Sequence, residues 1–152
     1  MSQILEIEDI KKILPHRYPF LLLDRVTDFE LGDWIEGFKN VSSGEPCFTG
    51  HFPEDSVFPG VLMTEAMAQL AGVLSVLTIK QNTQDYARYF YFTGLDRVRF
   101  KRIVIPGDRF DMHVKVVKRR SKIWKFEGVA TVGGEVACEA NFMLLSGESK
   151  ND

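Results

Sequence analysis

One acidic residue interrupts a long apolar stretch of the sequence. Between Val61 and Ile79, Glu65 is the only charged residue, and its neighbours are mostly Ala, Leu, Met and Val, several of which favour a helix. An unpaired carboxylate withdrawn from water is unfavourable, so Glu65 is expected to be paired, neutralised or used in chemistry. Because burial raises the pKa of a carboxyl group, Glu65 is a candidate proton donor near neutral pH.

Three further residues complete a candidate acid–base site. Gln69 follows Glu65 by four residues on the same helical face, within hydrogen-bonding reach. Gly60 is expected just before the helix, where backbone N–H groups suit an oxygen that gains negative charge. His51, in the preceding loop, is the candidate base. Taken alone, His51 also fits a structural loop histidine, and Glu65 fits a salt bridge. Together the groups suit proton removal beside a carbonyl with loss of a β-substituent.

The other two histidines have simpler interpretations. His16 lies between two prolines in LPHRYPF and is interpreted as a structural turn histidine, whereas His113 falls on the solvated face of a predicted strand. The sequence contains no phosphate-binding loop, dinucleotide fingerprint or zinc-protease motif, and its His and Cys residues do not cluster. We therefore expect no metal.

The composition is that of one soluble domain, predicted over residues 1–152 with a polar tail from about residue 147. It is 45% hydrophobic and 26% charged, with a formal net charge of −2. The N-terminus has no secretory signal, so we expect a cytoplasmic protein with free thiols. Residues 61–80 are long enough to cross a membrane, but Glu65, Gln69, Ser75 and Thr78 favour a central helix of the fold instead.

The predicted elements surround that helix with strands. Period-two alternation and turn residues indicate an antiparallel sheet, with a tight hairpin at Gly133-Gly134. The order is a helix at 6–14, strands at 20–26 and 34–42, a loop at 43–60, the helix at 61–80, and strands at 86–94, 96–104, 109–119, 122–132 and 135–145. This order predicts the α+β class.

Four segments carry a family resemblance. LPHRYPFLLLDRV, NVSSGEPCFTGHFP, FPGVLMTEAMAQ and FKRIVIPGD resemble the (3R)-hydroxyacyl-acyl-carrier-protein dehydratases of bacterial type II fatty acid synthesis, from about Ile7 to Leu145. The resemblance implies the hotdog fold, in which a curved antiparallel sheet wraps a long helix. It also implies that His51 and Glu65 are catalytic, that Gly60 donates to the thioester carbonyl, and that Gln69 orients the acid.

The resemblance further implies partners. The substrate is carried on the phosphopantetheine arm of acyl carrier protein, and no cofactor is expected. The chain is expected to form a homodimer with shared active sites, assembled into a hexamer, and to bind neither nucleic acid nor membrane. A single small sheet is expected to cover the helix poorly, so that a partner would bury it. The alternatives are a hotdog acyl-thioester hydrolase and a non-catalytic acyl-binding module.

Two sets of residues have predicted supporting roles. Met63, Tyr91 and Phe92 are candidates for an acyl tunnel or its gate, although core packing explains the methionine and an interface explains the tyrosine equally well. Between Arg97 and Lys125 there are eleven Lys or Arg residues and two acids, which suits an acidic partner. The predicted carrier-docking residues are Arg97, Arg99, Lys101, Arg102 and Arg120.

Overall fold

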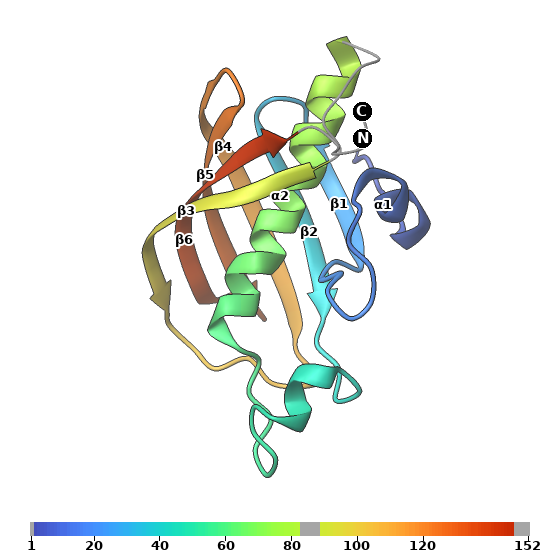
Figure 1. Ribbon diagram of the computed structural model, residues 1–152. Helices are drawn as coiled ribbons and strands as arrows, with labels where there is room; N and C mark the ends of the chain where they lie inside the picture. The colour runs from blue at the N-terminus through green and yellow to red at the C-terminus, as the bar shows by residue number, and fades with distance from the viewer. Residues whose placement is uncertain (1, 83–88, 148–152) are drawn as a thin grey trace.

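A long helix, α2 (Gly60–Asn82), runs across the concave side of a single curved sheet (Figure 1). The structure is a computed structural model, and it describes residues 2–82 and 89–147. The sheet has the strand order β1-β2-β4-β5-β6-β3, and every neighbouring pair is antiparallel. The strands are β1 (Arg25–Glu30), β2 (Trp34–Asn40), β3 (Tyr89–Phe100), β4 (Arg109–Arg120), β5 (Ile123–Val132) and β6 (Glu135–Gly147). The predicted α+β hotdog fold is confirmed.

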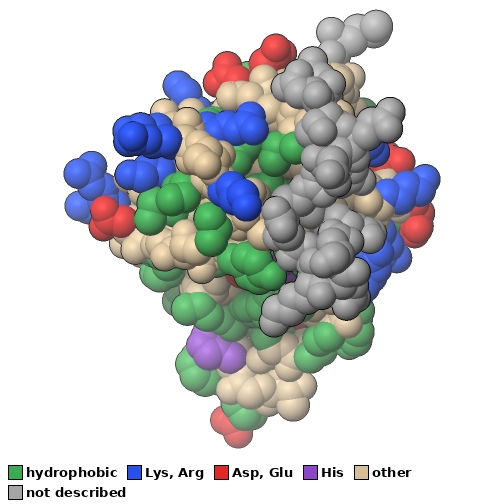
Figure 2. Space-filling view, turned by 45° about the horizontal axis from the view of Figure 1, so that its top comes forward, with side chains coloured by type: hydrophobic (Ala, Val, Ile, Leu, Met, Phe, Trp, Pro, Cys, Tyr) green, Lys and Arg blue, Asp and Glu red, His purple; other side chains and the backbone are tan. Residues whose placement is uncertain are grey.

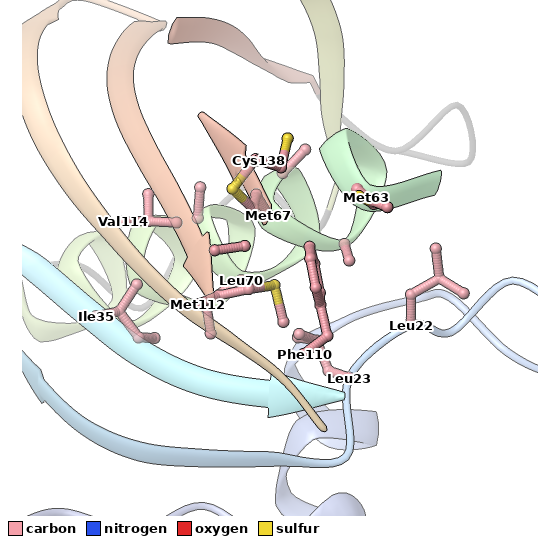
Figure 3. Packing of buried hydrophobic residues seen from close by; sticks show 14 of the residues in the cluster. Leu22, Leu23, Ile35, Met63, Met67, Leu70, Phe110, Met112, Val114 and Cys138 are labelled. Atoms are coloured by element: carbon pink, nitrogen blue, oxygen red, sulfur yellow. The ribbon is translucent and has the colours of Figure 1, made fainter. Parts of the chain in front are cut away.

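Alternation along the strands places one apolar face against α2. On β5 the buried side chains include Trp124, Phe126, Ala130 and Val132, as the period-two pattern predicts. Figure 3 shows the same arrangement around Met67 of α2, with side chains of β2, β4 and β6 directed towards the helix. The hairpin between β5 and β6 turns at two glycines, whose φ angles of 56° and 84° are both positive, as a tight hairpin requires.

The single chain buries α2 more completely than the sequence suggests. Every residue from Ala66 to Val76 is buried. By length and composition Gly60–Lys80 is apolar enough to cross a membrane, but 72% of that window is buried inside the fold. The expectation that α2 needs a partner for cover is therefore wrong. Its second side is covered by the chain around α1 (Ile7–Ile13), where Leu14 packs against Gly72.

Two strand predictions are wrong in detail. The segment predicted as a strand at 20–26 becomes regular only at Arg25, because Phe20 and Leu22 bond to a side chain of α2 instead of to a neighbouring strand. The strands predicted at 86–94 and 96–104 form one strand, β3, whose register shifts near Gly94 and between Asp96 and Arg99. Residues 86–88 of the first prediction lie outside the described residues.

The remaining elements follow the prediction closely. The helix predicted at 6–14 is α1, and the loop predicted at 43–60 contains one short 3-10 helix, η1 (Pro46–Thr49). Gly60 is the first residue of α2 and not the residue before it. β6 ends at Gly147, and the tail from 148 onward lies outside the described residues. Both cysteines are free thiols, as predicted.

Candidate active site

Gln69 holds the Glu65 carboxyl group in one orientation. Its Nε2 donates hydrogen bonds to Glu65 Oε1 at 3.1 Å and to the Phe20 carbonyl oxygen at 2.7 Å, while its Oε1 accepts the Leu22 N–H at 2.8 Å. The side chain is only 2% exposed. Because one amide end faces a donor and the other faces two acceptors, the amide cannot flip without losing these bonds. Glu65 Oε1 is thereby fixed as an acceptor, and an acidic proton belongs on Oε2.

The surroundings of Glu65 favour its protonated form. The side chain is 21% exposed. Burial raises the pKa of its carboxyl group, and the hydrogen bond from Gln69 opposes that shift by stabilising the carboxylate. The structure therefore places a carboxyl group of raised pKa on an otherwise apolar helix. Its Oε1 accepts a hydrogen bond from Gln69, and its Oε2 can carry the proton. Such a group suits a general acid.

His16 lies beside this carboxyl group, which the sequence did not suggest. Its Nε2 is 3.7 Å from Glu65 Oε1, and its Nδ1 is buried with no hydrogen-bond partner within the described part of the chain. Burial lowers the pKa of the imidazole, and the nearby Arg17 lowers it further. No local pattern signals the contact, because the two residues are 49 positions apart in the sequence. It depends on how the chain after α1 packs on α2.

The loop that contains His51 holds its imidazole in one tautomer. Its Nδ1 lies 2.7 Å from the Val57 carbonyl oxygen, and its ring stacks on Phe52 with centroids 4.0 Å apart. A carbonyl oxygen can only accept, so Nδ1 carries the hydrogen and Nε2 keeps its lone pair. That lone pair is what a general base needs. Among the described residues, no hydrogen bond or salt bridge joins His51 to Glu65 of the same chain.

Gly60 is the first residue of α2, and its backbone N–H is available as a hydrogen-bond donor. Its N–H has no acceptor within the described part of the chain, as expected at the first turn of a helix. A Cβ at this position would lie 2.8–3.0 Å from the ring of Phe100 at the end of β3. A larger residue at this position would therefore need the exposed Phe100 ring to move.

A small cavity adjoins the carboxyl group. Its volume is about 30 Å³, and its polar lining comes from His16, Glu65 and Gln69. Of the predicted tunnel residues, Phe92 lines it, and Phe90 lies beside Phe92 in the lining. Met63 lies in the buried core with Met67 (Figure 3) and does not line this cavity. Tyr91, which alternates with its two neighbours along β3, is about half exposed and is not part of the lining.

The five predicted docking residues lie in two separate regions of the structure. The register of the sheet puts Arg99 level with Glu139, Val129 and His113, whereas Arg120 pairs with Ile123 at the far end of β4. His113 and Arg120 are seven residues apart on one strand, or roughly 24 Å. Figure 2 shows one group of Lys and Arg side chains on the left of the viewed face, where Figure 1 places the β4–β5 hairpin, and a second group on the right.

Two docking candidates already have acidic neighbours. Lys101 pairs with Glu139 at 3.2 Å, and Arg102 pairs with Glu135 at 2.9 Å. Within the described part of the chain, no salt bridge involves Arg97, Arg99 or Arg120, and all three are exposed. These three are therefore the better candidates for an acidic partner.

The architecture identifies the fold class of the protein. A dehydratase heterocomplex from Xenorhabdus doucetiae matches with a TM-score of 0.76 at 22% identity, over 93% of this chain and 92% of that chain. A hypothetical thioesterase with coenzyme A from Streptococcus pneumoniae matches with a TM-score of 0.62 at 8% identity, over 94% and 98% of the two chains. At these identities the likeness establishes a shared fold, the hotdog fold.

Sequence comparison places the chain within that class. The FabA-like domain model matches residues 14–141. The 3-hydroxyacyl-[acyl-carrier-protein] dehydratase FabZ of Haemophilus influenzae (strain 86-028NP) is 51% identical over 93% of both chains, and that of Pasteurella multocida is 53% identical over 93% of this chain and 91% of the relative. The chain belongs to the FabA-like family, among its FabZ-type dehydratases. It is accordingly a hydro-lyase of fatty acid biosynthesis.

Proposed function

We propose that this protein dehydrates a (3R)-hydroxyacyl chain carried by acyl carrier protein to the trans-2-enoyl product, with His51 as base and Glu65 as acid. The observation that carries this assignment is the Glu65–Gln69 pair. It holds a carboxyl group of raised pKa with Oε1 committed to Gln69 and Oε2 available to donate a proton. The substrate class is that of the dehydratases from Haemophilus influenzae and Pasteurella multocida to which the chain is similar.

The proposed chemistry moves one proton at each end of the bond that becomes double. Nε2 of His51 removes the α-proton, and the thioester oxygen gains negative charge that the Gly60 N–H stabilises. The electron pair then forms the Cα–Cβ double bond as the Cβ–O bond breaks. Glu65 Oε2 gives its proton to the departing hydroxyl, which leaves as water. Transfer of the proton from His51 to Glu65 through solvent resets both groups, so the cycle needs no metal or cofactor.

The proposed active site is shared between two copies of the chain. Its support is that no hydrogen bond or salt bridge joins His51 to Glu65 within one described chain, together with the character of β3. β3 is an edge strand of twelve residues with exposed apolar side chains at Tyr89, Tyr91, Leu95 and Phe100. An apolar edge of this length favours pairing with another strand, although β3 has register shifts near Gly94 and between Asp96 and Arg99. A second copy on this edge would form a two-fold dimer, and we propose that such dimers assemble into a hexamer in the cytoplasm.

One assay distinguishes the proposal from its alternatives. Purified protein is given a (3R)-hydroxyacyl thioester, and the products are followed by mass. Dehydration yields an acyl thioester lighter by one water. A hotdog thioesterase, the alternative favoured by the fold likeness to a hypothetical thioesterase, yields the free acid and thiol. Binding without turnover would indicate an acyl-binding module, and either of these outcomes contradicts the proposed function.

Substitution of two neighbouring aromatic residues tests whether they form a gate for the acyl chain. We expect Tyr91→Ala to change the preference for acyl chain length, because Tyr91 is exposed on β3 between Phe90 and Phe92, which line the cavity at Glu65. Phe92→Ala is the variant to compare with Tyr91→Ala, because Phe92 lines that cavity directly. Relative kcat/KM values on short and long hydroxyacyl thioesters give the measurement. If Tyr91→Ala lowers only thermal stability, Tyr91 is an interface aromatic and not a gate.

Docking of the carrier protein is tested by charge reversal. We expect Arg99→Glu or Arg120→Glu to reduce kcat/KM for a carrier-linked substrate much more than for a small thioester analogue, with the difference shrinking at high salt. Because the two residues lie at separate places on the sheet, the pair also locates the docking surface. Lys115→Glu, an exposed reversal on β4, is the matched control. Equal losses on both substrates would show that neither arginine contacts the carrier.

A further inference from the structure

His16 occupies an unusual position for a turn residue. It lines the cavity at Glu65, its Nε2 is 3.7 Å from Glu65 Oε1, and its buried Nδ1 has no partner among the described residues. A buried polar atom without a partner is unfavourable, and an apolar side chain would avoid that cost if the position served packing alone. The imidazole therefore requires another explanation, and its nearest polar neighbour is the proposed acid.

The chain that carries His16 is held firmly in place. The Arg17 guanidinium donates hydrogen bonds to the carbonyl oxygens of Leu14 at 2.9 Å, His16 at 2.6 Å and Lys11 at 2.9 Å. These bonds tie the backbone of His16 to the end of α1. Beyond Arg17, the same chain is tied to α2, because Gln69 donates a hydrogen bond to the Phe20 carbonyl oxygen and accepts one from the Leu22 N–H. His16 and Glu65 thus approach each other from two anchored segments, and their separation is set by the fold.

The local chemistry selects one tautomer of His16. Burial and the adjacent Arg17 lower the pKa of the imidazole, which favours its neutral form. If Nδ1 carried the hydrogen, a buried N–H would be unpaired and the Nε2 lone pair would face a carboxyl oxygen that already acts as an acceptor. With the hydrogen on Nε2, a donor lies 3.7 Å from Glu65 Oε1, and the buried Nδ1 carries no unpaired N–H. Apart from His16, Glu65 and Gln69, the side chains that line this space are apolar: Leu14, Pro15, Ala68, Phe90, Phe92 and Leu144.

We propose that His16 is a positioning residue for the acid: its Nε2–H, together with Gln69 Nε2–H, forms a two-donor clamp on Glu65 Oε1. This inference rests on the proposed role of Glu65. The clamp keeps the acidic proton on Oε2 and stabilises the carboxylate that remains after the proton is given to the leaving hydroxyl. At 3.7 Å the contact is longer than a hydrogen bond, and such contacts in active sites often shorten when substrate binds.

Two amide substitutions separate this role from a structural one. In His16→Gln the amide reaches the place of Nε2 and can still donate to Glu65. In His16→Asn the side chain is one methylene shorter, so its amide takes the place of Nδ1 and cannot reach Oε1. The charged or titratable groups near Glu65 within the described chain are His16 and, behind it, Arg17, and neither variant changes Arg17.

The measurements are kcat, KM and the pH profile on a hydroxyacyl thioester, with infrared titration of the Glu65 carboxyl group identified by its loss in Glu65→Gln. For His16→Asn we expect kcat to fall about tenfold or more, as for loss of a hydrogen bond to a charged group. KM should stay nearly constant. Loss of a donor to the carboxylate raises the pKa of Glu65, so the infrared titration and the alkaline limb of the profile should move to higher pH. His16→Gln should resemble the wild type.

Other results overturn the proposal. If both variants behave as wild type, or if both lose activity and thermal stability to the same degree, His16 is only a structural residue. A shift of the Glu65 titration to lower pH in His16→Asn would mean that the imidazole excludes water and does not act as a donor. The infrared titration requires no turnover, so it tests the contact with Glu65 even if the wild-type protein proves inactive on the chosen thioester.

Discussion

Glu65→Gln is expected to abolish most dehydration while leaving the fold intact. The amide has nearly the same shape and can still accept the hydrogen bond from Gln69, but it has no acidic proton to give to the leaving hydroxyl. His51→Ala should have a comparable effect through loss of the base. Groups that act as general acid or base typically contribute about 10²–10⁴-fold each. Turnover numbers on a hydroxyacyl thioester, with thermal unfolding measured in parallel, give the test.

Glu36 and His113 provide matched controls for these two substitutions. Glu36 Oε1 and His113 Nδ1 are 3.1 Å apart, on the face of the sheet opposite to α2. Glu36→Gln and His113→Ala make the same chemical changes outside the proposed site, and both should keep nearly full activity. Near-wild-type turnover in either Glu65→Gln or His51→Ala would show that the acid–base assignment is wrong.

The pH profile of the wild-type protein also tests the assignment of Glu65 as the acid. Burial raises the pKa of Glu65, so the carboxyl group keeps its proton to higher pH than an exposed glutamate would. Only the protonated form can act as the acid. Activity should therefore decline as the pH rises through that raised pKa, and this alkaline limb should be absent from the residual activity of Glu65→Gln. A limb that persists unchanged in the variant belongs to another group.

Mixing two inactive variants is expected to restore activity if the site is shared. When His51→Ala and Glu65→Gln chains are dissociated and reassembled together, each heterodimer has one site with both wild-type residues and one site with neither. Random pairing places about half of the dimers in this form, so about a quarter of native activity should return, from two-fold symmetry alone. The activity of the reassembled mixture, with heterodimers quantified by native mass spectrometry, gives the measurement.

A second mixture controls for this interpretation. Wild-type chains are reassembled with an equal amount of the double variant carrying both substitutions. If sites are shared, each site of the heterodimer lacks one catalytic group, and about half of the wild-type activity should disappear on random pairing. If each chain builds its own site, the second mixture keeps its activity and the first stays inactive although heterodimers are present. That pair of results would contradict the shared site.

The sequence by itself determined the local parts of this protein. Glu65 and Gln69 are four residues apart in a helix, and helical geometry alone brings their side chains together. Period-two alternation identified the buried face of β5, since successive strand residues point to opposite sides. Two consecutive glycines marked the hairpin between β5 and β6 for a similar reason, because the turn needs positive φ angles.

The tertiary structure decided which distant segments complete the site. His16 reaches Glu65 across 49 positions only because the chain after α1 is bonded to Gln69, and no periodicity encodes such a contact. The extent to which one chain covers α2 likewise depends on tertiary structure, because part of the cover comes from that same irregular segment and not from predicted strands. Hydrophobic patterning reports which face of an element is buried, whereas the partner on that face depends on topology, which a single element does not contain.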